Sequence, residues 1–450
     1  MHRTQISHFR RRAGVTAILA VIGVFAGIVL TGGDAGQISS VSARRPTGSP
    51  QLISVEPFPV FGGEMCQWMP ASAGPTLVTA WMQEQLSARA ATPALEEQGM
   101  SVDADRAPVR IIRDSYPTYS AIAVDTNSNE VYLQDENLFG YKVFNRLDDT
   151  PPSAAFTEPK RMVGGINTKL EFNCGLYVDP NTGDVYSVNN DTVDTMVVFP
   201  REARGNVAPK RELRTPHGTW GIAVNEEAQE LYLTVEHINS VVVYRKMAEG
   251  EEKPLRTLAG DQTRLADPHG VALDTKNNWL FVANHGNLRN QRVPGSGRFL
   301  PPAITVYPLN ANGNTAPLRE IAGPNTQLNW PAAIAVDPGR GELYVANDTG
   351  DSILVFGTAD GGDVAPKRAI RGPKTGIKNP TGVFVDLKNE EVWVSNMGNA
   401  SATVYPLTAD GDVAPLRTIR SAPLGKLSQA IGNPGAVEYD SKREEVLVPN

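Results

Sequence analysis

The sequence predicts an all-β protein, a seven-bladed β-propeller built from four-stranded antiparallel blades, and three observations lead to this fold. Seven segments share one alternating apolar pattern, a second strand follows each at a constant interval, and the two chain ends carry complementary parts of the seventh repeat. Radial repetition leaves only short sheet edges exposed. A ring closed by both chain ends explains the incomplete repeats.

The first two strands of each blade are expected to form a hairpin. A small residue begins a strand that ends four residues later in Asp or Asn, and the centre of a second strand lies seven residues further on. Turn residues occupy the interval, as hairpins require. The seven first strands are 121–125, 175–179, 221–225, 270–274, 333–337, 382–386 and 436–440, and the second-strand centres are Tyr132, Tyr186, Tyr232, Phe281, Tyr344, Trp393 and Leu447.

Third strands follow in six copies, at 141–144, 196–199, 241–244, 304–307, 353–356 and 402–405. A fourth element, Pro-x-Arg-x-aliphatic, begins at Pro159, Pro209, Pro254, Pro317, Pro366 and Pro415, and also at Pro108 ahead of the first hairpin. Proline suits an outermost strand because that edge needs no N–H on its free side. The seventh blade therefore lacks a third strand, for which the upstream segment Leu52–Phe61 is one candidate source.

The N-terminal residues form separate units. Residues 1–36 carry Arg10–Arg12 before the apolar run Ala13–Thr31, which indicates a signal peptide or an uncleaved membrane anchor, and both interpretations place the rest of the chain outside the cytoplasm. Residues 37–105 are expected to be a linker with a short helix within 74–98, and residues 106–450 are the propeller. We expect the protein in the periplasm, at the cell surface or secreted.

Charge and cysteine content limit the function classes. The formal net charge is −7, and removal of residues 1–36, which carry a net +3, leaves −10. An acidic exported protein is a poor candidate for nucleic-acid binding. The only two cysteines, Cys66 and Cys174, form either one disulfide or two buried thiols, and the oxidising compartment favours the disulfide.

The histidines outside the first 36 residues gather in two consecutive blades. His217, His237, His269 and His285 fall where first strands begin or second strands end, positions that share the face of the ring at the channel mouth. Neutral imidazoles there could act as acid and base or bind a divalent metal, and Glu236 aligns with His285. The alternative is that they are loop histidines or hydrogen-bonded channel residues, and no HxH or HExxH spacing supports a metal.

Two further features lie on that face. The loop from Asn284 to Ile304 is about 14 residues longer than its counterpart after Asn347 and carries Arg289, Arg292 and Arg298, which could form a lid over an anionic or carbonyl-bearing ligand or simply a solvated loop. Asn284 belongs to a set of asparagines that close second strands. These either contact a ligand or tie loop backbone groups together.

The pattern P-x-G-[IV]-A-V-D, LYVAN, SIxVF and APxRxIxG resembles the bacterial NHL-repeat propellers over residues 106–450. This family includes lyases, lactonases and ligand-binding scaffolds, so the resemblance implies fold more than function. Pro268-His269-Gly270 is similar to streptogramin-type lyases, whose Trp-Phe-Thr-Glu strands are absent here. Gluconolactonase-like propellers imply a metal held by Glu236, Asn284 and Asp348.

Two hypotheses of function follow. The first is an exported propeller that binds a protein or small-molecule ligand at the channel face as a scaffold. The second is a metal-assisted lyase or lactonase in which His269, His285 and Glu236 perform the chemistry, while His217, His237 and Asn284 contact the ligand. The sequence leaves the substrate, the cofactor and the oligomeric state open.

Overall fold

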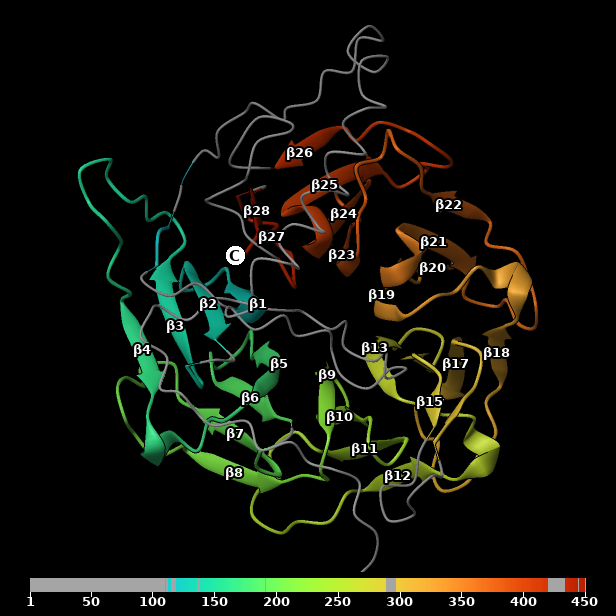
Figure 1. Cartoon of the computed structure of the whole chain (residues 1–450). Helices are drawn as coiled ribbons and strands as arrows, with labels where there is room; N and C mark the ends of the chain where they lie inside the picture. Colours follow the sequence, from blue (N-terminus) through green and yellow to red (C-terminus); the bar gives the residue numbers. More distant parts are fainter. Residues whose placement is uncertain are drawn as a thin grey trace, which may run out of the picture. The chain divides into compact units, whose positions relative to one another are not determined.

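The structure, a computed structural model, describes residues 110, 112–114, 119–135, 138–190, 192–288, 297–419, 434–443 and 445–449. All of these belong to the unit Gly63–Asn450. Four-stranded antiparallel sheets stand around a common axis, with the first strand of each sheet innermost (Figure 1). The predicted β-propeller fold of four-stranded blades is therefore confirmed.

Six blades are complete, and their strands follow the predicted order from the channel outward. The first strands are β1 (Tyr119–Asp125), β5 (Asn173–Val178), β9 (Thr219–Asn225), β13 (Pro268–Asp274), β19 (Pro331–Asp337) and β23 (Pro380–Asp386). The second strands are β2 (Glu130–Asp135), β6 (Val185–Asn189), β10 (Glu230–Val235), β14 (Trp279–Asn284), β20 (Glu342–Asn347) and β24 (Glu391–Asn396). The third strands are β3 (Gly140–Asn145), β7 (Thr195–Phe199), β11 (Ser240–Arg245), β17 (Ala303–Pro308), β21 (Ser352–Gly357) and β25 (Ser401–Pro406).

The fourth strands begin at the arginine of each Pro-x-Arg element: β4 (Arg161–Gly164), β8 (Arg211–Arg214), β12 (Arg256–Ala259), β18 (Arg319–Ala322), β22 (Arg368–Ile370) and β26 (Arg417–Ile419). Two short hairpins complete the strands, β15 (Asn287–Leu288) with β16 (Arg298–Phe299), and β27 (Glu438–Asp440) with β28 (Glu445–Leu447). Short 3-10 turns are η4 (Ile166–Thr168), η5 (Asp261–Thr263), η6 (Pro324–Thr326), η7 (Asp348–Gly350) and η8 (Met397–Asn399).

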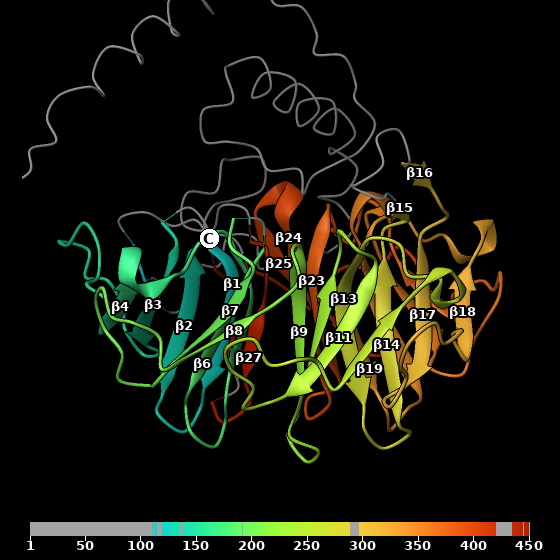
Figure 2. The ribbon, with the colours of Figure 1, turned by 90° about the horizontal axis from the view of Figure 1, so that it is seen from below.

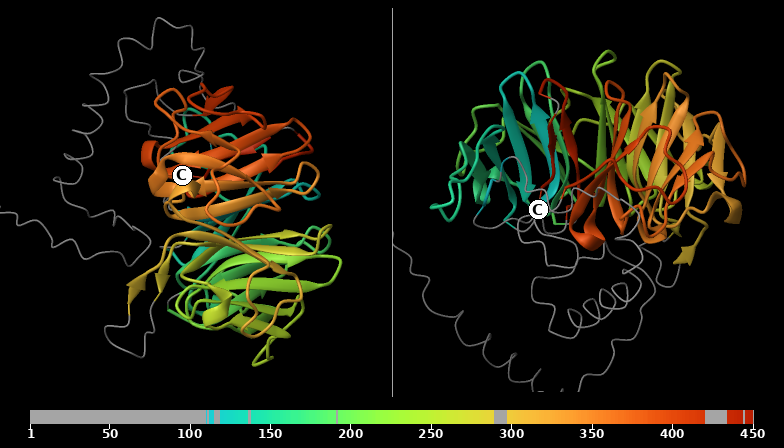
Figure 3. Two further views of the ribbon diagram at one scale, coloured as in Figure 1. Left: turned by 90° about the vertical axis from the view of Figure 1, so that its right-hand side faces the viewer. Right: turned by 90° about the horizontal axis from the view of Figure 1, so that it is seen from above.

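The expected count of seven complete blades is wrong for the described part of the chain, which has six. The predicted seventh hairpin is present as β27 and β28, in contact with β1 and β23 (Figures 1 and 3). No third or fourth strand is assigned to it among the described residues, and the described residues of the Pro108 element, Arg110 and Ile112, are outside any strand.

In three of the blades an ion pair explains the repeated arginine. Glu130, at the start of a second strand, accepts two hydrogen bonds of 2.7 Å from Arg161, at the start of the fourth strand. The pairs Glu230–Arg256 and Glu342–Arg368 repeat this arrangement. Arg110 contacts Glu445 in the same way, so the element after Pro108 adjoins the last hairpin.

A second set of contacts joins neighbouring blades. The cation that follows a third strand pairs with the aspartate that ends the first strand of the preceding blade: Arg201 with Asp125 at 2.9 Å, and Lys246 with Asp179 at 2.8 Å. Arg146 pairs with Asp440 in the corresponding position. The hairpin β27–β28 thus occupies the ring position that precedes the first blade.

Apolar cores fill the space between blades, as in the cluster of Tyr186, Val188 and Met196 from one blade with Leu231 and Leu233 from the next. Alternation along the strands produces this, because each strand shows one face to each neighbouring blade. The part of the chain that the structure describes contains no helix long and apolar enough to span a membrane. The predicted N-terminal signal or anchor, linker and helix lie outside the described residues.

Candidate functional site

The backbone at the channel mouth repeats one arrangement in five consecutive blades. The residue after each second strand donates its N–H to the carbonyl of the residue just before the first strand: Asn190 to Phe172 at 2.9 Å, Glu236 to Gly218 at 2.8 Å, His285 to Asp267 at 3.1 Å, Asp348 to Trp330 at 3.1 Å and Met397 to Asn379 at 3.1 Å. In the last four of these blades the acceptor residues have left-handed φ angles of 77°, 55°, 52° and 42°. For Asp267 and Trp330 this conformation carries strain, which proteins retain mainly at functional positions.

Five side chains from two of these blades form one group, here called the mouth cluster: Glu236, His237, Asp267, His269 and His285. Glu236 joins two of the histidines, with Oε1 3.0 Å from His237 Nε2 and Oε2 3.3 Å from His269 Nε2. Asp267 Oδ1 lies 3.5 Å from His269 Nδ1, and Oδ2 lies 3.8 Å from His285 Nδ1. Imidazoles and carboxylates therefore alternate through the cluster.

The cluster is poorly solvated. Its five side chains expose between 8% and 17% of their surface. Burial alone would raise the pKa of Glu236, but the hydrogen bond from His237 and the charge of His269 outweigh it, so that pKa is lowered. Burial raises the pKa of Asp267, and the nearby Glu236 carboxylate adds to the rise.

His269 lies between oxygen atoms on both sides. Its Nε2 faces Glu236, and its Nδ1 lies 3.2 Å from the carbonyl oxygen of Asp267. Both ring nitrogens of His269 therefore face oxygen atoms. Asn190 and Asn287 add neutral donors to Glu236 and Asp267, at 3.4 and 2.9 Å.

His285 is in a different state. Its ring stacks on His269, with centroids 3.7 Å apart and planes at 18°, and on Trp330, at 5.0 Å and 19°. Burial lowers the pKa of His285 well below its usual value, and the charge of His269 lowers it further. His285 Nε2 is buried without a hydrogen-bond partner in the described structure. Such a group costs about 1–3 kcal/mol and indicates a site that a bound donor would satisfy.

The remaining sequence candidates take different places. His217 lies at the rim, 43% exposed and 3.0 Å from Asp194, with its ring 4.8 Å from that of His237. Asn284 donates both amide N–H groups, to Thr305 Oγ1 at 3.0 Å and to carbonyls of its own sheet, and accepts from the N–H of Ala266. Of the two roles expected for Asn284, these hydrogen bonds fit the one in which its amide ties backbone groups of the loop together.

The insertion after Asn284 forms the hairpin β15–β16, which rises above the ring (Figure 2). Asn287, at its base, reaches Asp267 of the mouth cluster. Arg289 and Arg292, and the side chain of Arg298, lie outside the described residues, so the arginine lid stays a prediction. Cys174 is buried in β5, whereas Cys66 lies outside the described residues, and their disulfide also stays a prediction.

The geometry does not suit a metal held by the clustered histidines. Asp267, His269 and His285 bring ligand atoms within 4.8 Å of one another. Coordination uses the in-plane lone pair of each imidazole, however, and two rings stacked at 18° direct these lone pairs in parallel rather than toward one point. The set implied by gluconolactonase-like propellers fits no better, because Asn284 is engaged within its sheet and Asp348 accepts a hydrogen bond of 3.2 Å from Asn379.

Sequence reasoning missed two residues of this site, Asp267 and Trp330. Both directly precede a proline that begins a first strand, as Asn379 does in the next blade. The shared x-Pro position was the available signal, since it fixes which residue takes the left-handed conformation beside the mouth.

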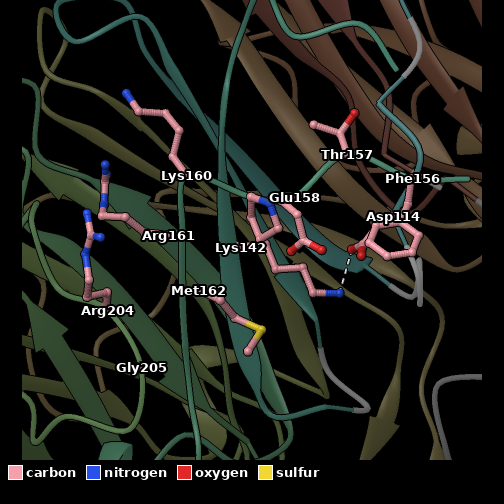
Figure 4. Close-up of a pocket in the computed structure, with 11 residues that line it drawn as sticks. Asp114, Lys142, Phe156, Thr157, Glu158, Lys160, Arg161, Met162, Arg204 and Gly205 are labelled. Atoms are coloured by element: carbon pink, nitrogen blue, oxygen red, sulfur yellow. Dashed lines mark hydrogen bonds and ion pairs between the residues drawn. The ribbon is translucent and has the colours of Figure 1, made fainter. Parts of the chain in front are cut away.

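One described cavity lies elsewhere. It has a volume of about 570 Å³ and is lined by Lys142, Lys160, Arg161 and Met162 among others (Figure 4). Its cations are largely neutralised within the protein, because Lys142 pairs with Asp114 at 2.5 Å and both Lys160 and Arg161 pair with Glu130. We therefore place the candidate site at the mouth cluster.

Comparison with known proteins supports the architecture. No family model and no curated protein matches the chain. Among solved structures, hydrazine synthase of Kuenenia stuttgartiensis aligns with a TM-score of 0.51 and 12% identity, over 75% of this chain and 96% of that chain. The fold is that of a β-propeller. At this identity the likeness concerns fold alone, and membership of the NHL-repeat family rests on the sequence pattern.

Proposed function

We propose that the protein is an exported NHL-type propeller that binds a ligand at the channel mouth, with the mouth cluster as its binding site. The observation that carries this proposal is the buried, unsatisfied Nε2 of His285 at the centre of a stack of aromatic rings. A cluster that served only stability would be expected to satisfy its own polar atoms.

The charge arrangement supports the same conclusion. Two buried carboxylates are costly to remove from water, and replacement of buried charged groups by apolar residues is often neutral or stabilising. The other blades build their mouths without such a cluster: the residues equivalent to His269 in the next two blades are Ala332 and Thr381. Stability alone therefore does not explain the mouth cluster.

A ligand screen by thermal shift on the full chain tests this function. The screen is expected to identify ligands that raise the melting temperature of the protein. The double variant His269→Ala, His285→Ala should lose these shifts in melting temperature. Glu251→Gln is a matched control that should keep them, because Glu251 is 79% exposed and lies at the outer edge of the ring beside Arg214 of the outermost strand β8. Ligands that raise the melting temperature of the double variant as much as that of the unsubstituted protein would place binding elsewhere and overturn the proposal.

Export is the second part of the proposal and rests on Arg10–Arg12 with the apolar run that follows. A reporter fused to the C-terminus, active only after translocation, should be active, and replacement of Arg10–Arg12 by glutamates should reduce its signal. Reporter activity confined to the cytoplasm would contradict export.

A further inference from the structure

Three carboxylates follow one another around the mouth: Glu236, Asp267 and Asp348. Among the described residues, no Lys or Arg forms an ion pair with any of them, although most other buried acids of the ring have such a partner. Their partners are histidines and the amides of Asn190, Asn287 and Asn379. We call these three carboxylates the acidic arc. Among the described residues its partners are histidines and amides, and no Lys or Arg is paired to it.

Trp330 is the aromatic residue at the centre of this arc. One face of its ring stacks on His285, whose Nδ1 faces Asp267, and its carbonyl accepts the N–H of Asp348. An aromatic ring flanked by carboxylates is a recognised arrangement for binding a cation. Trp220, 4.8 Å from His269, closes the other end of the stack.

His285 specifies the ligand further. Its side chain is 92% buried, its Nε2 has no hydrogen-bond partner among the described residues, and its ring is neutral because burial lowers its pKa. When the proton resides on Nδ1, toward Asp267, Nε2 is a bare acceptor that requires a donor. A cation without N–H groups, such as a quaternary ammonium, cannot supply one.

We propose that the mouth binds a small organic cation that carries N–H donors, of the ammonium or amidinium class, beside Trp330 and between Asp267 and Asp348. This inference rests on the proposed function, which places the ligand at the mouth cluster, and adds the chemical class of that ligand. The ligand neutralises the acidic arc and donates a hydrogen bond to His285 once Nε2 is uncovered.

The raised pKa values of two of the acids agree with this view. Burial raises the pKa of Asp348, and the charge of Asp351 adds to the rise, so both Asp267 and Asp348 bear an unfavourable negative charge at neutral pH. A bound cation would relieve it. Binding should accordingly weaken as these acids become protonated and as added salt screens the attraction.

Isothermal titration of the full chain with four matched probes tests the inference. Benzamidinium has a planar cation with N–H donors, benzamide is its neutral analogue, phenyltrimethylammonium is a cation without N–H donors, and benzoate is the anion expected if the insertion arginines dominated. We expect measurable binding of benzamidinium below about 10 mM and at least about tenfold weaker binding of the other three.

Variants locate the binding. Trp330→Leu should weaken benzamidinium binding about tenfold, Trp330→Phe should largely retain it because the aromatic face remains, and Asp348→Asn should weaken it about fivefold. Glu251→Gln removes one exposed carboxylate at the outer edge of the ring, beside Arg214, and should leave binding unchanged.

Two results would overturn the inference. Benzamide or benzoate binding as tightly as benzamidinium would show that the ligand is not a cation, and the thermal-shift screen would still decide whether the mouth is the site. Absence of benzamidinium binding at about 10 mM, or binding unaffected by Trp330→Leu and Asp348→Asn, would refute the cation site itself.

Discussion

The imidazole rings of His269 and His285 stack with their centroids 3.7 Å apart, although His269 lies in β13 and His285 follows β14 of the same blade. The sequence placed both residues at the mouth, but their relative orientation decides what they can do. Burial between His269 and Trp330 lowers the pKa of His285, so its imidazole stays neutral. This buried, neutral imidazole underlies the proposed ligand site.

Ring closure depends on Arg146. Its side chain is fully buried and pairs with Asp440 and Glu445 of the last hairpin. Arg146→Ala leaves a buried aspartate uncompensated and should lower the free energy of unfolding by about 3–5 kcal/mol. Lys442→Ala, which removes one exposed contact to Thr126, should change it by less than about 1 kcal/mol in the same denaturant titration. Equal losses would mean that Arg146 does not close the ring.

The ion pair between Glu130 and Arg161 makes the free energy of unfolding depend on pH. Burial alone would raise the pKa of Glu130, but hydrogen bonds from Arg161 and Lys160 outweigh it and lower the pKa from 4.5 to about 2. The folded state thus holds this proton less tightly than the unfolded state. The resulting stability is present above pH 4.5 and is lost as the pH falls toward 2.

Glu130→Gln should therefore lower the melting temperature at pH 7, and the difference from the unsubstituted protein should shrink as the pH falls below about 4. Glu158→Gln, an exposed carboxyl, is the matched control and should show no such trend. A difference that is constant from pH 7 to about pH 2.5 would argue against the pairing.

A turn residue offers a stabilising substitution. Glu390 has φ 58° immediately before β24, the position that Gly183 and Gly341 occupy in two other blades. Its ion pair with Arg340 is exposed and contributes little. Glu390→Gly relieves left-handed strain and should raise the free energy of unfolding by about 0.5–1 kcal/mol. Lys388→Gly, in the same turn but without a positive φ, should lower it, and the opposite order would contradict the turn geometry.

The predicted disulfide can be tested by peptide mapping. Cys174 is buried near the beginning of the second blade, and a bond to Cys66 would tether the segment before the propeller. Non-reduced digests should yield one linked peptide pair, and Cys66→Ser should lower the melting temperature because the unfolded chain gains freedom. Recovery of both cysteines as free thiols would refute the bond.

The sequence predicted the blades well because their signals are local. Alternation and the constant hairpin interval recur in every complete blade, and the Pro-x-Arg arginine forms the same ion pair in three of them, such as Glu130 with Arg161. The blade that contains the last hairpin was harder to predict. Its predicted strands come from distant parts of the chain, and an apolar pattern such as Pro108–Ile112 does not reveal whether a partner strand lies beside it.

The site was predictable in part. The four histidines and Glu236 could be placed at the mouth from strand boundaries alone, since residues that follow second strands share one face. Asp267 and Trp330 could not be recognised as site residues, because their role depends on left-handed backbone angles. The stacking of His285 on Trp330 joins two blades and has no sequence signature.

The most direct test of the central claim compares the dissociation constant of one ligand from the thermal-shift screen for three forms of the full chain. These are the unsubstituted protein, His285→Phe, which keeps an aromatic ring but removes Nε2, and Glu251→Gln at the outer edge of the ring. A site at the mouth predicts that His285→Phe weakens binding about tenfold or more while Glu251→Gln changes nothing. Equal dissociation constants for all three proteins would contradict a ligand site at the mouth cluster.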